Sequence, residues 1–221
     1  EELRQSARER ELMLAGISHD LRTPLARLRL ALELGDANDP GRRDAMVNDL
    51  DELDKALAQC LAYVRDGSDE AVRAIDIPTL LGQLMALRHA PDDWHYEGHD
   101  DAVLHARPSL LRRALGNLMD NAEHYGAAPF RVRLQRAGDE LSISVEDHGP
   151  GVPEDLLARL GQPFLRGNAA RTGACGTGLG LSIVKRAAEI SGGRLQLANR
   201  SGGGFSATLV LPLAARERSP A

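Results

Sequence analysis

The sequence predicts a multi-domain protein in which an all-α helical hairpin, assembled into a dimeric four-helix bundle, precedes an α+β domain. Apolar residues recur at steps of three and four between residues 14 and 64, as they do in packed helices. Beyond residue 70, short alternating runs typical of strands are interleaved with helical patterns. With 221 residues, 43% of them hydrophobic, the chain is long enough to bury two cores.

The helical hairpin is predicted from two apolar seams separated by the turn-forming stretch "GDANDPG". The first seam consists of Leu14, Ile17, Leu21, Leu25, Leu28 and Leu32. The second consists of Met46, Val47, Leu50, Leu53, Leu57, Cys60 and Val64. Because two helices alone leave one side of each seam exposed, we expect a homodimer through the helical hairpin.

The α+β domain is predicted from short strands and two helical patterns. Strand-like runs are "RAIDI", "DDWHYEG" and "DAVLHA", and the helical patterns cover 78–89 and 108–124. The runs "FRVRLQRA" and "ELSISVED", separated by Gly138 and Asp139, predict a hairpin, and "GRLQLANR" with "GFSATLVLPL" predicts another. The expected division is a hairpin domain over 1–67, a linker over 68–76, an α+β domain over 77–213 and a disordered tail over 214–221.

Composition excludes several classes of function. The net charge of -5 argues against direct binding to nucleic acid or to an anionic membrane, since both select for clustered cations. Cys60 and Cys175 lie far apart and outside any metal-ligand spacing, which argues against a zinc site or a disulfide framework. No apolar run approaches the roughly 20 residues that span a bilayer, so we expect any membrane link to run through segments absent from this chain.

The stretch "SHDLRTPL" contains the first candidate for chemistry. At about 100° per residue, His19 lies about 160° from Ile17 and Leu21, so it points away from the seam, and Thr23 shares its face. A neighbouring carboxylate, Asp20, can orient the imidazole and take its Nδ1 proton while the other nitrogen attacks an electrophile. The pattern predicts a nucleophilic histidine; an ordinary solvated helix histidine is the alternative.

Two further patterns suit a nucleotide. Asn117 and Asn121 lie one turn apart on the flank of a helix, where amide oxygens can face Mg²⁺ without adding charge beside a triphosphate. Alternation along "ELSISVED" turns Asp147 inward after Val145, where an adenine amino group would be a suitable donor and guanine would not. The alternatives are a pair of surface amides and a simple turn capped by Asp147.

The third pattern is "GTGLGLSIVKRAAEIS", in which closely spaced glycines run into a helix N-terminus that favours phosphate. It is no Walker A loop, because no Gly-Lys-Ser/Thr follows, and it lacks the last glycine of the dinucleotide fingerprint. The preceding "PFLRGNAARTGAC" contains Arg166 and Arg171 and is typical of a mobile lid over phosphates, with a merely flexible loop as the alternative.

Five motifs together resemble those of a sensor histidine kinase. "SHDLRTPL" resembles the H box, "NLMDNAEHYG" the N box, "VEDHGPG" the G1 box, "PFLRG" the F box and "GTGLGL" the G2 box, in the family's order over residues 18–181. The chain resembles the cytoplasmic core of that family, most of all its EnvZ osmosensor branch. The resemblance implies a HisKA hairpin followed by an α+β sandwich ATP-binding domain of the GHKL or Bergerat type.

The resemblance also implies roles for individual residues. His19 would be the phosphoacceptor, Asp20 its acid/base partner, and Thr23 the residue that orients water for dephosphorylating a regulator. Asn121, with help from Asn117, would coordinate Mg²⁺. The implied ATP-binding residues are Asn117, Asn121, His124, Tyr125, Asp147, Gly149, Gly151, Phe164, Arg166, Gly176, Thr177, Gly178, Leu179, Gly180 and Leu181.

The implied function is autophosphorylation of His19 from Mg-ATP and transfer to an aspartate in the receiver domain of a response regulator of the winged-helix kind. The resemblance also implies phosphatase activity on that regulator. It further implies that the chain is the cytoplasmic portion of a bacterial inner-membrane protein. A phosphatase-biased module or an ATP-binding scaffold is the alternative. A clamp ATPase of the Hsp90 or MutL type is disfavoured, because the helical pattern over 78–89 has no glutamate.

His124 departs from the family pattern, in which many members carry Arg or Lys before the N-box aromatic. A neutral imidazole would contact phosphates less strongly than a cation. Because imidazoles titrate near physiological pH, we expect ATP binding to strengthen at mildly acid pH.

Overall fold

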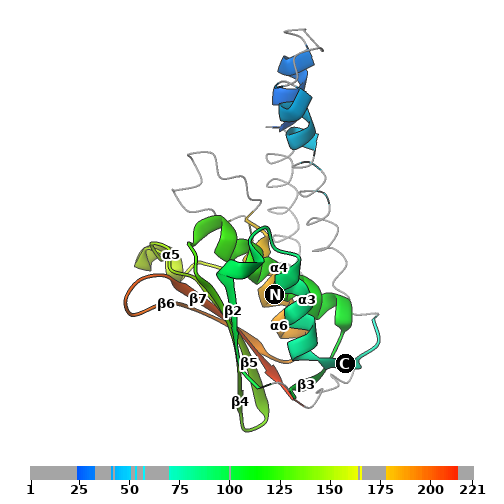
Figure 1. The fold of residues 1–221 in the computed structure, drawn as a ribbon, viewed down its shortest axis with the longest axis vertical. Helices are drawn as coiled ribbons and strands as arrows, with labels where there is room; N and C mark the ends of the chain where they lie inside the picture. The colour runs from blue at the N-terminus through cyan, green and yellow to red at the C-terminus, as the bar shows by residue number, and fades with distance from the viewer. Residues whose placement is uncertain are drawn as a thin grey trace, which may run out of the picture. The chain divides into compact units, whose positions relative to one another are not determined.

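The computed structural model describes residues 24–32, 41, 43–50, 53, 57, 70–99, 101–163, 165 and 178–213. The chain divides into two compact units. One comprises Glu1–Arg65 with Gln162–Leu179, and the other comprises Asp66–Gly161 with Gly180–Ala221. Figure 1 labels helices α3 to α6 and strands β2 to β7 of the second unit.

Among the described residues of the first unit, continuous helical segments cover 24–32 and 43–50. An ion pair joins them, since Arg27 Nη2 lies 2.6 Å from Asp49 Oδ1 and Arg27 Nε donates to the same oxygen at 2.7 Å. Within the predicted seam Leu28 is buried, whereas Leu25 remains 53% exposed. Among the residues described for this unit, the other exposed large apolar side chains are Leu30, Leu32, Val47, Leu50 and Leu57. The segments therefore leave apolar surface uncovered, as expected of an isolated hairpin.

The second unit is built on a five-stranded sheet with strand order β2-β4-β5-β7-β6. Its strands are β2 (Trp94–Glu97), β4 (Phe130–Ala137), β5 (Glu140–Glu146), β6 (Arg194–Asn199) and β7 (Phe205–Pro212). β2 pairs in parallel with β4, and the other pairs are antiparallel. A separate two-stranded sheet pairs β1 (Arg73–Asp76) with β3 (Val103–Ala106). β1 therefore lies in the segment expected to be a linker.

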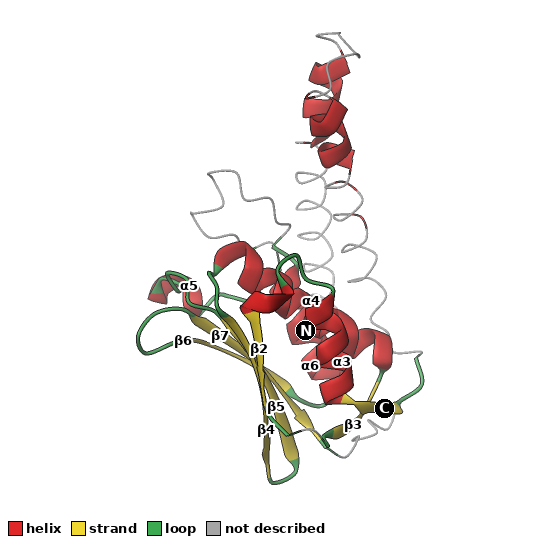
Figure 2. Cartoon of the chain, viewed as in Figure 1, coloured by secondary structure: helices red, strands yellow, loops and turns green. Residues whose placement is uncertain are grey.

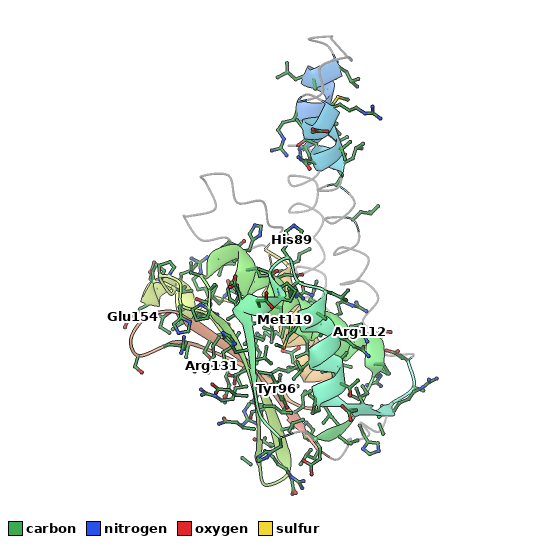
Figure 3. The ribbon with its side chains drawn as sticks, viewed as in Figure 1. His89, Tyr96, Arg112, Met119, Arg131 and Glu154 are labelled. Carbon is green, nitrogen blue, oxygen red and sulfur yellow. The ribbon has the colours of Figure 1, made fainter. Side chains whose placement is uncertain are left out.

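Helices cover one face of the larger sheet (Figure 2). They are α3 (Ile77–Ala86), α4 (Pro108–Tyr125) and α6 (Gly180–Ile190); η1 (Pro91–Asp93) and α5 (Glu154–Leu157) are short. Met119 of α4 is fully buried in this core (Figure 3). Leu115 and Ile143 are fully buried in it as well. The predicted α+β domain is thus confirmed as a two-layer sandwich.

The helix starts are fixed by carboxylates. Asp76 Oδ1 accepts a 2.7 Å hydrogen bond from the Thr79 amide at the start of α3, and hydrogen bonding to Thr79 lowers the pKa of Asp76. Glu70 accepts from both the amide and the hydroxyl of Ser109 in the first turn of α4, at 2.9 Å each. These contacts satisfy amides that a helix leaves without internal partners, so they set where α3 and α4 begin.

One predicted boundary is wrong. The helix expected over residues 78–89 ends at Ala86, because the Arg88 amide bonds the Met85 carbonyl at 3.0 Å, a tighter i to i+3 closure. Pro91 follows and disfavours helical backbone at the residue before it. α4, in contrast, matches its prediction to within one residue.

Both predicted hairpins form. β4 and β5 turn at Gly138, whose φ of 59° lies in the left-handed region that glycine tolerates. β6 and β7 are joined by a turn in which Gly202, Gly203 and Gly204 all have positive φ. The second turn brings residues 199–205 against the end of β5, which builds the candidate site.

Candidate functional site

Asp147, directly after β5, is the residue around which the site is built. Its side chain is turned inward as predicted, and the residue is only 4% exposed. Asp147 Oδ1 accepts hydrogen bonds from the amides of Gly149 at 2.7 Å and Phe205 at 3.3 Å. The Asp147 amide donates to the Phe205 carbonyl at 3.0 Å. Two strands and a loop therefore fix this carboxylate.

The second oxygen of this carboxylate, Oδ2, is the one that can accept a hydrogen bond from a ligand. In the described part of the chain, Asp147 Oδ2 accepts no hydrogen bond, whereas Oδ1 accepts two. An ionised carboxylate oxygen is an acceptor only, so Oδ2 can take a hydrogen bond from a ligand. The arrangement therefore suits a ligand that brings an N–H donor to Oδ2, such as an exocyclic amine.

Three glycines enclose Asp147, and only one of them was a predicted site residue. A Cβ on Gly126, at the end of α4, would collide with the Asp147 side chain, and one on Gly204 would collide with its carbonyl oxygen. A Cβ on Gly149 would lie 2.7 Å from the Gly126 Cα. The backbone segments around the carboxylate therefore approach more closely than any side chain allows.

The loop after Asp147 is tied to β6. The amide of Val152 donates to Asn199 Oδ1 at 2.8 Å, and Asn199 Nδ2 donates back to the Val152 carbonyl at 2.7 Å. Gly151, with φ of 73°, allows this approach, because a Cβ there would lie 2.9 Å from Asn199 Oδ1. The predicted glycine of the G1 motif thus has a defined role in closing the loop.

The two asparagines of α4 lie one turn apart and are half-buried. Asn117 Nδ2 donates to the Arg113 carbonyl at 2.9 Å, which directs the Asn117 amide. Asn117 Oδ1 lies 3.4 Å from where a Cβ of Gly180 would be, so α4 approaches the start of α6 closely. Asn121 occupies the same flank one turn later, nearer the end of α4 and its exposed residues.

At the end of α4, His124 and Tyr125 are exposed, with ring centroids 5.2 Å apart in an edge-on arrangement. On the glycine-rich segment Gly178 has φ of 67°, Gly180 begins α6, and Leu179 is buried. Leu181, in the first turn of α6, packs against the core. The first amides of a helix lack internal partners, so this end of α6 suits an anion.

The structure brings only part of the predicted set together. Gly149 joins Asp147, Asn117 faces Gly180, and His124 adjoins Tyr125. Seven predicted residues lie outside the described residues: His19, Asp20, Thr23, Phe164, Arg166, Gly176 and Thr177.

Sequence reasoning missed four residues that shape the site: Gly126, Asn199, Arg200 and Gly204. Gly126 carried a signal, because it closes the quoted "NLMDNAEHYG" motif. The run "NRSGGG" after β6 carried another, since three successive glycines indicate a turn that other residues cannot make.

The residues present fit a magnesium ion that is held jointly with a ligand. Among the described residues no group of three or more His, Cys, Asp or Glu side chains could hold a metal alone. Mg²⁺ prefers oxygen donors and commonly keeps water and phosphate oxygens in its shell. The amide oxygens of Asn117 and Asn121 are such donors and would complete a shell shared with a nucleotide.

A two-layer sandwich with an inward carboxylate, Asp147, and a glycine-led helix, α6, is the arrangement expected of an ATPase domain. Residues 106–215 match the family described as "Histidine kinase-, DNA gyrase B-, and HSP90-like ATPase". Residues 9–75 match the His Kinase A (phospho-acceptor) domain. The chain therefore belongs to the sensor histidine kinases, and the predicted resemblance is confirmed.

Individual histidine kinases are also similar to this chain in sequence or in fold. The sensor histidine kinase GtrS of Pseudomonas aeruginosa is 36% identical over 211 residues, which cover 92% of this chain and 42% of GtrS. The chain thus spans less than half the length of that relative. The Acinetobacter baumannii histidine kinase AdeS shares the fold, with a TM-score of 0.72 at 18% identity over 88% of this chain and 98% of that one. The histidine kinase domain of the E. coli osmosensor EnvZ is 29% identical, with a TM-score of 0.52 over 69% of this chain and 96% of that one.

We predict that Gly126→Ala weakens ATP binding, because the added Cβ displaces the Asp147 carboxylate. Loss of one hydrogen bond to a charged group corresponds to about tenfold or more in affinity. Calorimetric titration of the 221-residue chain with ATP and Mg²⁺ measures the effect.

The control is Gly82→Ala in α3, where a Cβ meets nothing within 4 Å. It should leave ATP affinity unchanged and stabilise the fold by about 0.5–1 kcal/mol. Wild-type affinity in Gly126→Ala would contradict the assignment.

Proposed function

We propose that this chain is the catalytic core of a two-component sensor kinase, which transfers the γ-phosphoryl group of Mg-ATP to His19 and then to an aspartate of a response regulator. The observation that carries the proposal is Asp147, a buried carboxylate with one oxygen left for a donor, within a domain that matches the ATPase family. Support for His19 comes from the phospho-acceptor match over residues 9–75.

The geometry of Asp147 supports the proposal of adenine recognition. Its Oδ2 would accept from the exocyclic amine of adenine, while Oδ1 stays bonded to the amides of Gly149 and Phe205. Guanine would present a carbonyl oxygen to this acceptor, and the two oxygens repel. Tyr125, 42% exposed at the end of α4, offers an aromatic surface on which the nucleotide would pack.

The phosphates would lie at the start of α6, where Gly178 and Gly180 line the approach and the helix dipole favours negative charge. Asn121, helped by Asn117, would hold Mg²⁺, which supplies charge neutralisation to the phosphates when bound. Phe164 and Arg166 would belong to a lid, and Gly176 and Thr177 to its phosphate-facing end. These four assignments rest on the family's motifs.

Transfer to His19 is positioning chemistry in which few protein atoms change bonds. One imidazole nitrogen of His19 forms a bond to the γ-phosphorus as the bond from that phosphorus to the bridging oxygen breaks, and ADP leaves with that oxygen. The Nδ1 proton passes to Asp20. Thr23, on the same helix face, would orient the water that dephosphorylates the regulator.

The partners follow from the same assignment. The exposed apolar residues of the helical unit, which include Leu30 and Leu50, would be covered in a homodimer through the hairpin. A receiver domain, that of a winged-helix regulator, would accept the phosphoryl group. No helix among the described residues is both long and apolar enough to cross a membrane. Because ATP is its substrate, we place the chain as the cytoplasmic portion of a bacterial inner-membrane sensor.

The composition of helix α3 argues against a clamp ATPase. α3, with the sequence "IPTLLGQLMA", carries no acidic side chain that could activate water for hydrolysis. A phosphatase-biased module or an ATP-binding scaffold remains the competing function, and the experiment below separates it from a kinase.

We predict that the chain incubated with γ-labelled ATP and Mg²⁺ acquires an acid-labile, alkali-stable label that His19→Gln abolishes. A phosphorus–nitrogen bond hydrolyses in acid and survives alkali, whereas a phosphate ester does not behave this way. His105→Gln, at an exposed position in β3, is the matched control and should label like the wild type. Absence of label despite measurable ATP binding would contradict the kinase and favour the phosphatase-biased module or the scaffold.

We predict that ATP binding strengthens between pH 8 and pH 6 and that His124→Arg removes most of this change, because an arginine stays cationic throughout. Charged neighbours on α4 are Asp120, one turn before, and Glu123. Affinity measured across this pH range for the wild type, His124→Arg and the control His105→Arg tests the effect. Flat affinity in the wild type, or an unchanged slope in His124→Arg, would overturn the role of His124.

A further inference from the structure

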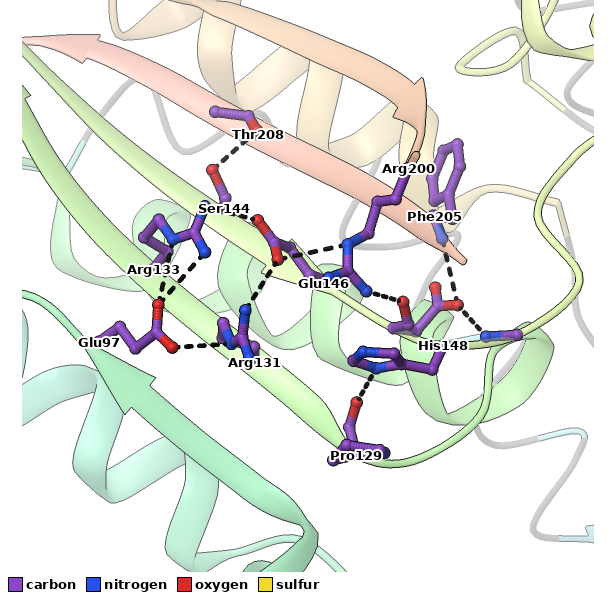
Figure 4. Close-up of polar contacts among 12 residues, drawn as sticks. Glu97, Pro129, Arg131, Arg133, Ser144, Glu146, His148, Arg200, Phe205 and Thr208 are labelled. Atoms are coloured by element: carbon purple, nitrogen blue, oxygen red, sulfur yellow. Dashed lines mark hydrogen bonds and ion pairs between the residues drawn. The ribbon is translucent and has the colours of Figure 1, made fainter. Parts of the chain in front are cut away.

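An ionic network crosses the face of the sheet opposite the helices (Figure 4). Its members are Glu97 of β2, Arg131 and Arg133 of β4, Glu146 of β5, and Arg200 just after β6. In each strand they alternate with core residues, so their side chains lie on the side that no helix covers. The network therefore runs from the sheet edge to the β6–β7 turn.

Glu146 is the centre of this network. Although it faces away from the core, it is only 7% exposed, because arginine side chains cover it. Glu146 Oε1 lies 3.3 Å from Arg133 Nη1, and Oε2 lies 3.4 Å from Arg200 Nε and 4.0 Å from Arg131 Nη1. A buried carboxylate needs such compensation. In return, Glu146 fixes the guanidinium of Arg200, which is 20% exposed.

Arg200 carries this constraint to the site. Its Nη1 donates a 2.6 Å hydrogen bond to the backbone carbonyl of Asp147. Its own backbone is fixed by the turn, since the Arg200 amide donates to the Gly204 carbonyl at 3.0 Å and the Gly203 amide donates to the Arg200 carbonyl at 3.2 Å. Both ends of the side chain are therefore held when it meets Asp147.

With Arg200 in place, the amide, the carbonyl and Oδ1 of Asp147 all have partners within the unit. Only Oδ2 is left for a ligand among the polar atoms of this residue, as far as the described residues show. Arg200 approaches from the open face of the sheet, and the carboxylate projects toward the core face. From the open face, Arg200 therefore sets the orientation of the peptide group that contains the Asp147 carbonyl.

We propose that Arg200 is a positioning residue for adenine recognition, which holds Asp147 so that Oδ2 meets the exocyclic amine. The inference rests on the proposed nucleotide site and adds the residue that gives it base specificity. Since Arg200 bonds the backbone of Asp147 from the opposite face, its loss should weaken the base contact and spare the phosphate contacts at α6. The signature is a change in base discrimination, with a smaller change in affinity for the triphosphate.

The test compares ATP with purine riboside triphosphate, which lacks the 6-amino group, by calorimetric titration of the chain with Mg²⁺ present. The wild type should prefer ATP by about tenfold or more, the value of one hydrogen bond to a charged acceptor. Arg200→Met keeps the length of the side chain and removes its charge and donors. This variant should bind the analogue like the wild type and lose most of its preference for ATP.

Two further variants sharpen the comparison. Arg200→Lys retains one cationic group, which cannot bridge Glu146 and Asp147 as a guanidinium fork does, so an intermediate preference is expected. Arg194→Met, at the start of the strand that Arg200 directly follows, is the matched control. Arg194 bonds Glu140 at 2.8 Å, at the other end of β6 from the turn that holds Arg200. Its removal should leave the discrimination ratio unchanged.

Each outcome decides the proposal. A parallel loss of affinity for both nucleotides in Arg200→Met would overturn it in favour of a general structural role, and so would an unchanged ratio. In those cases a wild type that prefers ATP leaves the proposed nucleotide site standing. A wild type that binds both nucleotides equally would overturn the Arg200 proposal together with adenine recognition by Asp147.

Discussion

The two hydrogen bonds that Asp147 Oδ1 accepts from the amides of Gly149 and Phe205 are the interaction on which the site depends. They join the end of β5, the loop that follows it and the start of β7 at one carboxylate. Because both donors are backbone groups, they can reach Oδ1 only where the main chain comes very close. The glycines at 126 and 204 provide that approach. The position of this one carboxylate thus requires glycine in two separate segments, at the end of α4 and before β7.

Consecutive residues, Glu146 and Asp147, place two carboxylates below 10% exposure on opposite faces of the sheet. Breaking the pairing of a buried charge costs several kcal/mol, more than a surface ion pair returns, so both must be compensated. The two solutions differ. Backbone amides serve Asp147, which keeps its second oxygen for a ligand, whereas arginines serve Glu146 and leave it no role in binding. Arg200 belongs to both arrangements, since it contacts Glu146 on the open face of the sheet and the backbone carbonyl of Asp147.

Much of the fold could be predicted because its patterns are local. Strict alternation in β5 placed Asp147 inward, and the apolar stripe of α4 gave that helix its bounds and set Asn117 and Asn121 on one flank. Other features are not local. The parallel pairing of β2 with β4 and the contact of Arg200 with Asp147, 53 residues apart, arise from the register of the sheet.

Burial of Glu146 was equally unpredictable from periodicity, since alternation assigns it to the open face. It is buried by long arginine side chains from neighbouring strands and not by the core. The phosphoacceptor role of His19 and the water-orienting role of Thr23 came from the family motifs, because both residues lie outside the described part of the chain. Local sequence thus predicted which carboxylate would turn inward, and tertiary contacts determined how firmly it is held.

The most direct test is a crystal structure of the chain with Mg²⁺ and a non-hydrolysable ATP analogue. The account predicts the adenine amino nitrogen at about 3 Å from Asp147 Oδ2, with Oδ1 still bonded to the amides of Gly149 and Phe205. An adenine whose amino group lies beyond hydrogen-bond reach of Oδ2, or a carboxylate that has released the Gly149 amide to bind it, would contradict the account.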